Sequence, residues 1–148
     1  MRWEHLVLDL NGTLACDGAL VAGVADRVAL LRERLLVHLL TADTHGTGQA
    51  VAGKLGIACH RLSAQPGESE RSLKQAYVEG LGPELVVAIG NGANDAGMLG
   101  AASLGIAVLG AEGTAMTALV AADVAAPTIL DALDLLLKPT RLLATLRC

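Results

Sequence analysis

Polar side chains follow several apolar segments of this sequence at the points where those segments end. The run HLVLDL contains Asp9 and leads into Asn11, within VLDLNGTL. The run LLVHLLT ends in Thr41, and LVVAIGN opens the segment GNGAND, which ends at Asp95. Asp, Asn, Gly and Thr are ordinary turn and cap residues, so each cluster alone also has a purely structural explanation.

Taken together, the three clusters have the side chains for binding an anion and a hard metal ion. Gly12 lets the chain turn sharply and expose backbone N–H groups, which can bind an anion. Asn91 and Asp95 have side-chain oxygens that could point into one cleft at the ends of the strands, which we call the mouth. Asp9 and Asp95 together would form a hard-oxygen site suited to Mg²⁺.

Short apolar runs alternate with longer amphipathic segments, and this alternation must position the polar clusters. We expect strands at 5–10, 35–41, 57–62, 85–91 and 104–110 and in ADVAA around Asp123. We expect helices at 21–34, 46–55, 68–81, 95–102, 114–122 and 127–137. Continuous apolar strands are typical of a sheet that is buried on both faces. In the helix expected at 21–34, Val24, Val28, Leu31 and Leu35 form a single apolar stripe.

The alternation predicts an α/β fold with a Rossmann-like, doubly wound parallel sheet in one domain, residues 1–148. In such a sheet, ligands bind beyond the carboxyl ends of the strands. The three polar clusters would therefore meet at one edge. The tail, residues 141–148, is expected to form either a last helical turn packed on the sheet or a partner contact.

The composition excludes several classes of function. Hydrophobic residues make up 53% of the 148 residues and aromatic residues 1%, and the net charge is −4. A surface with few aromatic rings and no basic patch is unsuited to nucleic acid. No apolar stretch is long enough to span a membrane. The cysteines, Cys16, Cys59 and Cys148, form no CxxC pair, and we expect a cytoplasmic chain with reduced thiols.

The ordered set DLNGT, LLTAD, a lone lysine in a helix, and GNGANDAGML resembles the haloacid dehalogenase-like superfamily. It is most similar to members related to the phosphorylation domain of P-type ATPases and to capless small phosphatases. The resemblance extends from Asp9 to about Asp123, and GNGANDAGML followed by LGIAV is its most specific part. It implies a three-layer α/β/α fold and an Mg²⁺-dependent phosphohydrolase or phosphotransferase acting on a phosphorylated small molecule or a phosphoprotein.

The resemblance also implies a role for each matching residue. Asp9 would be the nucleophile that becomes an aspartyl phosphate. Asn11 stands where phosphatases have an acid/base aspartate, and its backbone C=O would bind Mg²⁺. Phosphate would be bound by Asp9, Gly12, Thr41, Ala42 and Lys74. Magnesium would be bound by Asp9, Asn11, Asn91 and Asp95.

Two positions depart from the pattern of the superfamily. An amide at Asn11 cannot protonate a leaving alkoxide or activate water, which predicts slow turnover on poor leaving groups or a persistent phosphoenzyme. Asn91 replaces an aspartate that usually binds Mg²⁺, so we expect weaker metal binding. Both departures leave open an alternative, a non-catalytic or regulatory domain that binds phosphate or a partner. A receiver-like signalling domain fits less well, because receivers place the phosphorylated aspartate at the third strand.

Lys74 lies beside an apolar stripe of its predicted helix, where a lysine is usually solvated. Its position before the strand that carries GNGAND favours the phosphate-binding role over Lys54, which follows the second strand. His45 could reach the mouth or simply start a helix, and Asp43 could cap that helix. The sequence has no room for a cap domain, so we expect an open mouth. Apolar composition and the missing cap suggest a homo-oligomer.

Overall fold

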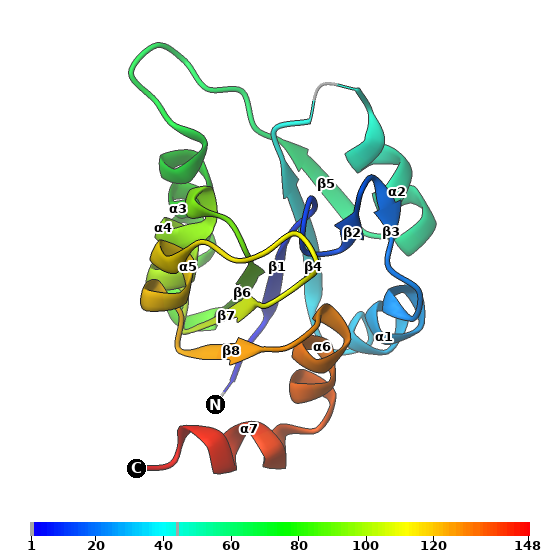
Figure 1. The fold of residues 1–148 in the computed structure, drawn as a ribbon, viewed down its shortest axis with the longest axis vertical. Helices are drawn as coiled ribbons and strands as arrows, with labels where there is room; N and C mark the ends of the chain where they lie inside the picture. Colours follow the sequence, from blue (N-terminus) through cyan, green and yellow to red (C-terminus); the bar gives the residue numbers. More distant parts are fainter. Residues whose placement is uncertain (1, 44) are drawn as a thin grey trace.

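A computed structural model describes residues 2–43 and 45–148 of the chain. One six-stranded parallel sheet forms its centre, and its strand order is β5-β4-β1-β6-β7-β8 (Figure 1). The expected strands are confirmed, and the whole sheet is parallel. Their bounds are β1 His5–Asp9, β4 Leu36–Thr41, β5 Ala58–Arg61, β6 Val86–Gly90, β7 Leu104–Val108 and β8 Val124–Ala126.

Helices cover both faces of the sheet and produce the three layers that the sequence predicts. They are α1 Val24–Leu31, α2 Thr47–Leu55, α3 Glu70–Leu81, α4 Ala96–Ala101, α5 Met116–Ala121, α6 Ile129–Leu137 and α7 Pro139–Leu146, with short 3₁₀ turns at Pro83–Leu85 and Ala93–Asp95. One apolar core joins α1, α2 and α6 to the sheet, and a second joins α3, α4 and α5 to its other face. Alternate residues of β1 enter the two cores: Leu6 and Leu8 enter the first and Val7 the second.

Helix α1 is shorter than expected at both ends, since it begins after Gly23, whose φ is 92°, and ends at Leu31. A hairpin occupies the chain before it. Strands β2 (Ala15–Cys16) and β3 (Ala19–Leu20) pair antiparallel directly after β1. The turn between them has positive φ at both Asp17 (51°) and Gly18 (81°), a combination typical of tight two-residue hairpins. The sequence analysis predicted no strand here, because each strand is too short to show an alternating pattern.

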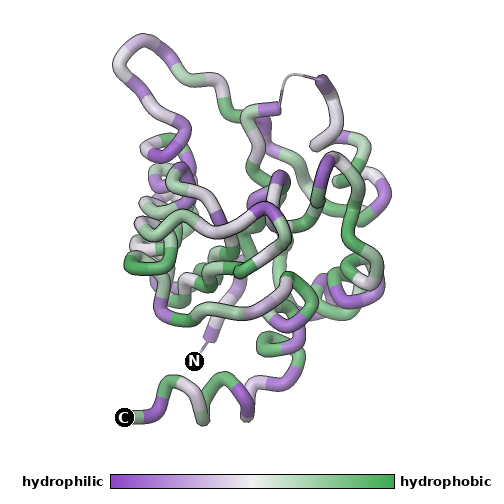
Figure 2. The backbone as a smooth tube through the Cα atoms, in the orientation of Figure 1, coloured by the Kyte–Doolittle hydropathy of each residue, from purple (hydrophilic) through white to green (hydrophobic). Residues whose placement is uncertain are grey.

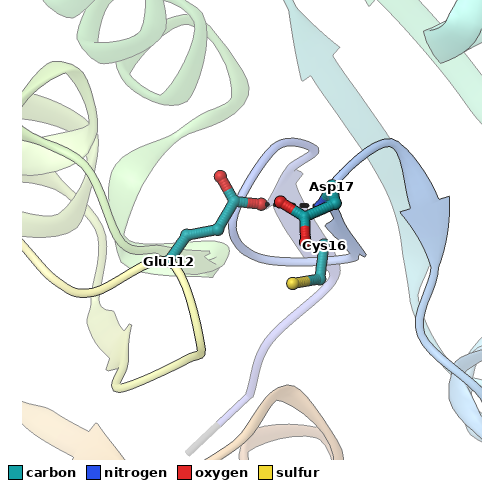
Figure 3. Close-up of side chains that lie close together, drawn as sticks. All are labelled: Cys16, Asp17 and Glu112. Carbon is teal, nitrogen blue, oxygen red and sulfur yellow. Dashed lines mark hydrogen bonds between the residues drawn. The ribbon is translucent and has the colours of Figure 1, made fainter.

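The tip of the hairpin lies against the loop after β7 (Figure 3). The Asp17 N–H donates a hydrogen bond to the Glu112 carboxylate over 3.1 Å. Cys16 lies beside this pair, and partial burial together with the two carboxylates raises the pKa of its thiol. A protonated thiol is a poor nucleophile, so Cys16 is unsuited to nucleophilic chemistry.

The tail forms helix α7, whose Leu142 is fully buried in the first core. Figure 2 shows hydrophilic and hydrophobic segments alternating along this helix, as expected for a helix with one buried face. Within residues 2–43 and 45–148, no helix has the length and hydrophobicity needed to cross a membrane.

Candidate functional site

The three polar clusters meet at the carboxyl edge of the sheet, because β4, β1 and β6 are neighbours. Asp9 ends β1, Thr41 ends β4, and Asn91 follows β6 directly. They line the mouth, a cleft of about 370 Å³. The residues that line it are Asp9, Asn11, Thr41, Ala42, Asp43, Glu70, Asn91, Gly92 and Asn94.

Lys74 extends from α3 to the base of the mouth, where it joins two carboxylates. Its Nζ lies 2.7 Å from Asp9 Oδ1 and 2.7 Å from Asp95 Oδ1. The side chain is 0% exposed, so the solvated alternative for this lysine is wrong. A buried ammonium is stable only when it is paired, and here it is paired twice.

The charges in this cluster shift the proton affinities of its members. Burial and the nearby Asp95 carboxylate raise the pKa of Asp9 from 3.8 to about 7, although Lys74 and Thr13 act in the opposite direction. Burial lowers the pKa of Lys74, but attraction to Asp9 and Asp95 outweighs it and raises that pKa above its usual value. Lys74 is therefore charged, and two carboxylates share one cation. Such a site favours an additional proton or metal ion.

Asp95 is fully buried, and both of its oxygens are engaged. Its Oδ2 accepts hydrogen bonds from the backbone N–H groups of Asn91 and Gly92, each over 3.0 Å. The carboxylate can fold back onto the end of β6 because Gly90 has no Cβ, which would overlap it. Asp95 thus fixes the shape of the GNGAND loop and anchors Lys74, and it does not line the mouth.

Thr13, which the sequence analysis did not single out, links Asp9 to the loop after β6. Its hydroxyl oxygen lies 3.2 Å from Asp9 Oδ2 and 3.2 Å from Asn91 Oδ1. The Asn91 amide is oriented by its Nδ2, which donates to the Gly113 carbonyl over 3.1 Å. The hydroxyl proton is shared between these two acceptors. The two acceptors, a carboxylate oxygen of Asp9 and an amide oxygen of Asn91, are the types of ligand that Mg²⁺ accepts.

Thr41 is held with its hydroxyl proton available. The Asp43 N–H donates to Thr41 Oγ1 over 3.0 Å, so the hydroxyl can still donate to a bound ligand. The Asp43 carboxylate accepts hydrogen bonds from the N–H groups of His45, Thr47 and Gly48. These bonds, with that from His45 the largest, lower the pKa of Asp43, although partial burial opposes them. The N-cap of α2 is Gly46 and not Asp43, but the Asp43 carboxylate accepts hydrogen bonds from the first two N–H groups of that helix.

The remaining predicted residues are placed differently. Asn11 and Ala42 line the mouth, and the Asn11 side chain is exposed. The Gly12 N–H donates to the Ala15 carbonyl over 2.8 Å, and Gly12 lies outside the mouth. Phosphate binding by Gly12 stays a prediction. His45 is exposed before α2 and does not line the mouth.

Glu70 is a mouth residue that the sequence analysis missed. It is the first residue of α3, and its Oε1 lies 3.7 Å from Lys74 Nζ. The signal was present in the spacing, because residues four apart on a helix share one face. A lysine that faces the mouth therefore predicts that the residue four positions earlier also faces it.

Three histidines form a separate cluster on the α3 side of the sheet. The ring nitrogens His5 Nδ1 and His38 Nε2 lie 3.0 Å apart, and the Tyr77 hydroxyl lies 3.0 Å from His38 Nδ1. The His60 ring lies 4.7 Å from that of Tyr77, centre to centre. Burial, followed by the neighbouring His5 and His60, lowers the pKa of His38 to about 4.

Comparison with known proteins gives matches in two groups. No protein-family model matches the chain. It is 33% identical over 107 residues to the probable copper-transporting ATPase PacS of Synechocystis, covering 72% of this chain and 14% of the ATPase. It is 43% identical over 83 residues to an uncharacterized protein of Methanocaldococcus jannaschii, covering 53% of this chain and 89% of that protein. The chain thus spans a small part of the ATPase that it matches.

Solved phosphatase structures share the fold over almost their whole length. The 3-deoxy-D-manno-octulosonate 8-phosphate phosphatase of Moraxella catarrhalis, in complex with magnesium, phosphate and KDO, superposes with a TM-score of 0.68 at 19% identity. That match covers 98% of this chain and 94% of the phosphatase. A phospho-aspartyl intermediate analogue of phosphoserine phosphatase has a TM-score of 0.68 at 15% identity, covering 93% and 99%.

Proposed function

Because the chain shares the fold of magnesium-bound and phospho-aspartyl phosphatase structures and matches part of a P-type ATPase, we propose that it is a haloacid dehalogenase-like protein that transfers a phosphoryl group through an aspartyl phosphate on Asp9. The observation that carries the proposal is the contact of 2.7 Å between Asp9 at the mouth and the buried, charged Lys74. A carboxylate beside a fixed cation at an open cleft is suited to attack an anionic phosphorus centre.

In the proposed reaction, the phosphoryl group of a monoester enters the mouth. An Asp9 oxygen forms a bond to phosphorus, and the bond from phosphorus to the ester oxygen breaks. Lys74 neutralises charge beside Asp9, and the Thr41 hydroxyl donates a hydrogen bond to a phosphoryl oxygen. Mg²⁺ bound by Asp9, Asn91 and the Asn11 carbonyl would supply further positive charge next to the phosphoryl oxygens.

The nature of Asn11 sets the leaving group that this site can expel. An amide cannot give a proton to a departing alkoxide, so the leaving group must be stable as an anion. Substrates with acidic leaving groups, such as acyl or aryl phosphates, are therefore expected to react faster than sugar phosphates. The phosphatase neighbours suggest a phosphorylated small molecule as substrate, and a phosphoprotein is the second candidate class.

A second candidate function is phosphate or partner binding without catalysis. It is favoured by the two amides at positions 11 and 91, which remove an acid/base group and one negative charge from the mouth. In this case Lys74 and Thr41 would hold a phosphate group, and Asp9 would remain unmodified.

The deciding experiment measures hydrolysis of p-nitrophenyl phosphate at saturating Mg²⁺ by the native protein, Asp9→Asn and Asn11→Asp. We expect Asp9→Asn to abolish activity while preserving the fold, since Asn has nearly the same shape as Asp and Lys74 keeps its contact with Asp95. Asn11→Asp should raise turnover by up to roughly a hundredfold, because it restores a general acid and base.

Native activity in Asp9→Asn would disprove the nucleophile assignment. If all three proteins are inert and none binds beryllium fluoride, a mimic of the phosphoryl group, the catalytic proposal fails and partner binding is left. Inert proteins that bind beryllium fluoride would instead favour the phosphate-binding function.

A further inference from the structure

We propose that Glu70 is the general base for hydrolysis of phospho-Asp9, the role that the amide of Asn11 cannot perform. The inference rests on the proposed function and extends it to the second half of the reaction. An aspartyl phosphate that lacks a nearby base is hydrolysed slowly, because water must lose a proton as it attacks.

The position of Glu70 fits this role. Its carboxylate lines the mouth together with Asp9, and its side chain is 34% exposed, so water can reach it. Asp9 Oδ1 and Glu70 Oε1 contact the same Lys74 ammonium, at 2.7 Å and 3.7 Å. They can be no farther apart than these two distances laid end to end. Two hydrogen bonds to a shared water span roughly 5–6 Å, close to this upper limit, so Glu70 lies within reach of a water molecule beside Asp9.

The other carboxylates of the site are already engaged in hydrogen bonds, in an ion pair or in carrying the phosphoryl group. The Asp43 carboxylate accepts three backbone hydrogen bonds, which stabilise its charged form. Asp95 is fully buried and divides its oxygens between Lys74 and two backbone N–H groups. Asp9 itself would carry the phosphoryl group. Among the described residues that line the mouth, Glu70 is the remaining carboxylate, and no backbone N–H binds it.

In the proposed step, a water oxygen forms a bond to phosphorus while one of its protons passes to the Glu70 carboxylate. The bond between phosphorus and the Asp9 oxygen breaks, and its electron pair restores the Asp9 carboxylate. Inorganic phosphate leaves through the open mouth. Glu70, whose side chain is partly exposed, then releases its proton to solvent.

A purely structural role for Glu70 predicts a different result. An acidic residue in the first turn of a helix, four residues before a lysine, stabilises the helix in any case. If that were its whole contribution, substitution would alter stability or the position of Lys74. Formation and hydrolysis of the phosphoenzyme would then change together.

The test separates the two half-reactions in single-turnover experiments with p-nitrophenyl phosphate. Release of nitrophenolate reports formation of the phosphoenzyme. The decrease in labelled phosphate that remains on the acid-precipitated protein reports hydrolysis of the phosphoenzyme. The proteins compared are the native chain, Glu70→Gln, Glu70→Asp and Glu79→Gln. Glu79 is an exposed carboxylate in the last turn of the same helix and serves as the matched control.

We expect Glu70→Gln to form the phosphoenzyme at close to the native rate and to hydrolyse it roughly a hundredfold more slowly. Glu70→Asp should recover part of the rate, and Glu79→Gln should match the native protein. Native hydrolysis in Glu70→Gln, or an equal slowing of both half-reactions, would overturn the assignment. A native protein that forms no phosphoenzyme would remove the proposed function itself, and this inference with it.

Discussion

Removing the charge of Lys74 should cost more stability than any other single change in the mouth. Lys74→Met keeps a long side chain in the core but leaves Asp9 and Asp95 without their shared cation. The lysine is 0% exposed and contacts each carboxylate at 2.7 Å, so water cannot replace it. Breaking a buried ion pair by removing one partner costs about 3–5 kcal/mol, and we expect a loss of that size in the free energy of unfolding at pH 7.

The loss should depend on pH in a defined direction. In the native protein the pKa of Asp9 is raised from 3.8 to about 7, so the stability linked to its protonation is present at low pH and lost as the pH rises toward 7. Without Lys74 the pKa of Asp9 rises further, which extends this loss to higher pH. The difference between Lys74→Met and the native protein should therefore be largest near pH 8 and smallest near pH 5.

The assay is urea unfolding of both proteins between pH 5 and pH 8, with a chelator present so that no divalent cation replaces the ammonium. Lys54→Met is the control, because Lys54 is exposed on α2 and its replacement should change stability by less than about 0.5 kcal/mol. If Lys74→Met costs no more than Lys54→Met, or costs the same at every pH, then Lys74 is not the charge partner of the two carboxylates.

Three further predictions concern the metal site, the first turn and the histidine cluster. Asn91→Asp should lower the Kd for Mg²⁺ about tenfold by restoring a carboxylate, as measured by calorimetry, and an unchanged Kd would argue against metal binding by Asn91. Gly12→Ala should destabilise the fold by about 1–3 kcal/mol in urea unfolding, because φ is +78° there and a Cβ would overlap the Asn91 side chain; a neutral result would mean that this turn relaxes freely. The lowered pKa of His38 means that its neutral form is stabilising, so stability should fall by on the order of 1–2 kcal/mol as the pH drops from 6.5 to 4. His38→Gln should flatten that part of the pH profile, and an equally steep profile would place the titration elsewhere.

The order of strands and helices could be predicted because each depends on local pattern. A run such as Val86–Gly90 is apolar throughout, so it must be buried on both faces, and the amphipathic α3 must lie against it. The polar turn residues that follow the strands could also be recognised in the sequence, and they identified Asp9, Thr41 and Asn91 as candidate site residues. The hairpin at Ala15–Leu20 was not predicted, because two-residue strands carry no period and their pairing depends on positive φ at Asp17 and Gly18.

The sequence by itself determined which residue types stand at the ends of the strands, and hence the kind of chemistry available to this protein. Only the tertiary structure decided that Lys74 joins Asp9 to Asp95 and that Thr13 links Asp9 to Asn91. The tertiary structure likewise gathers the scattered histidines around Tyr77. Local propensity acts over a few neighbouring residues, whereas these contacts join residues far apart in the chain. Those residues are brought together by the strand order, the parallel register and the crossover connections. These features of the sheet are fixed by the packing of the whole core.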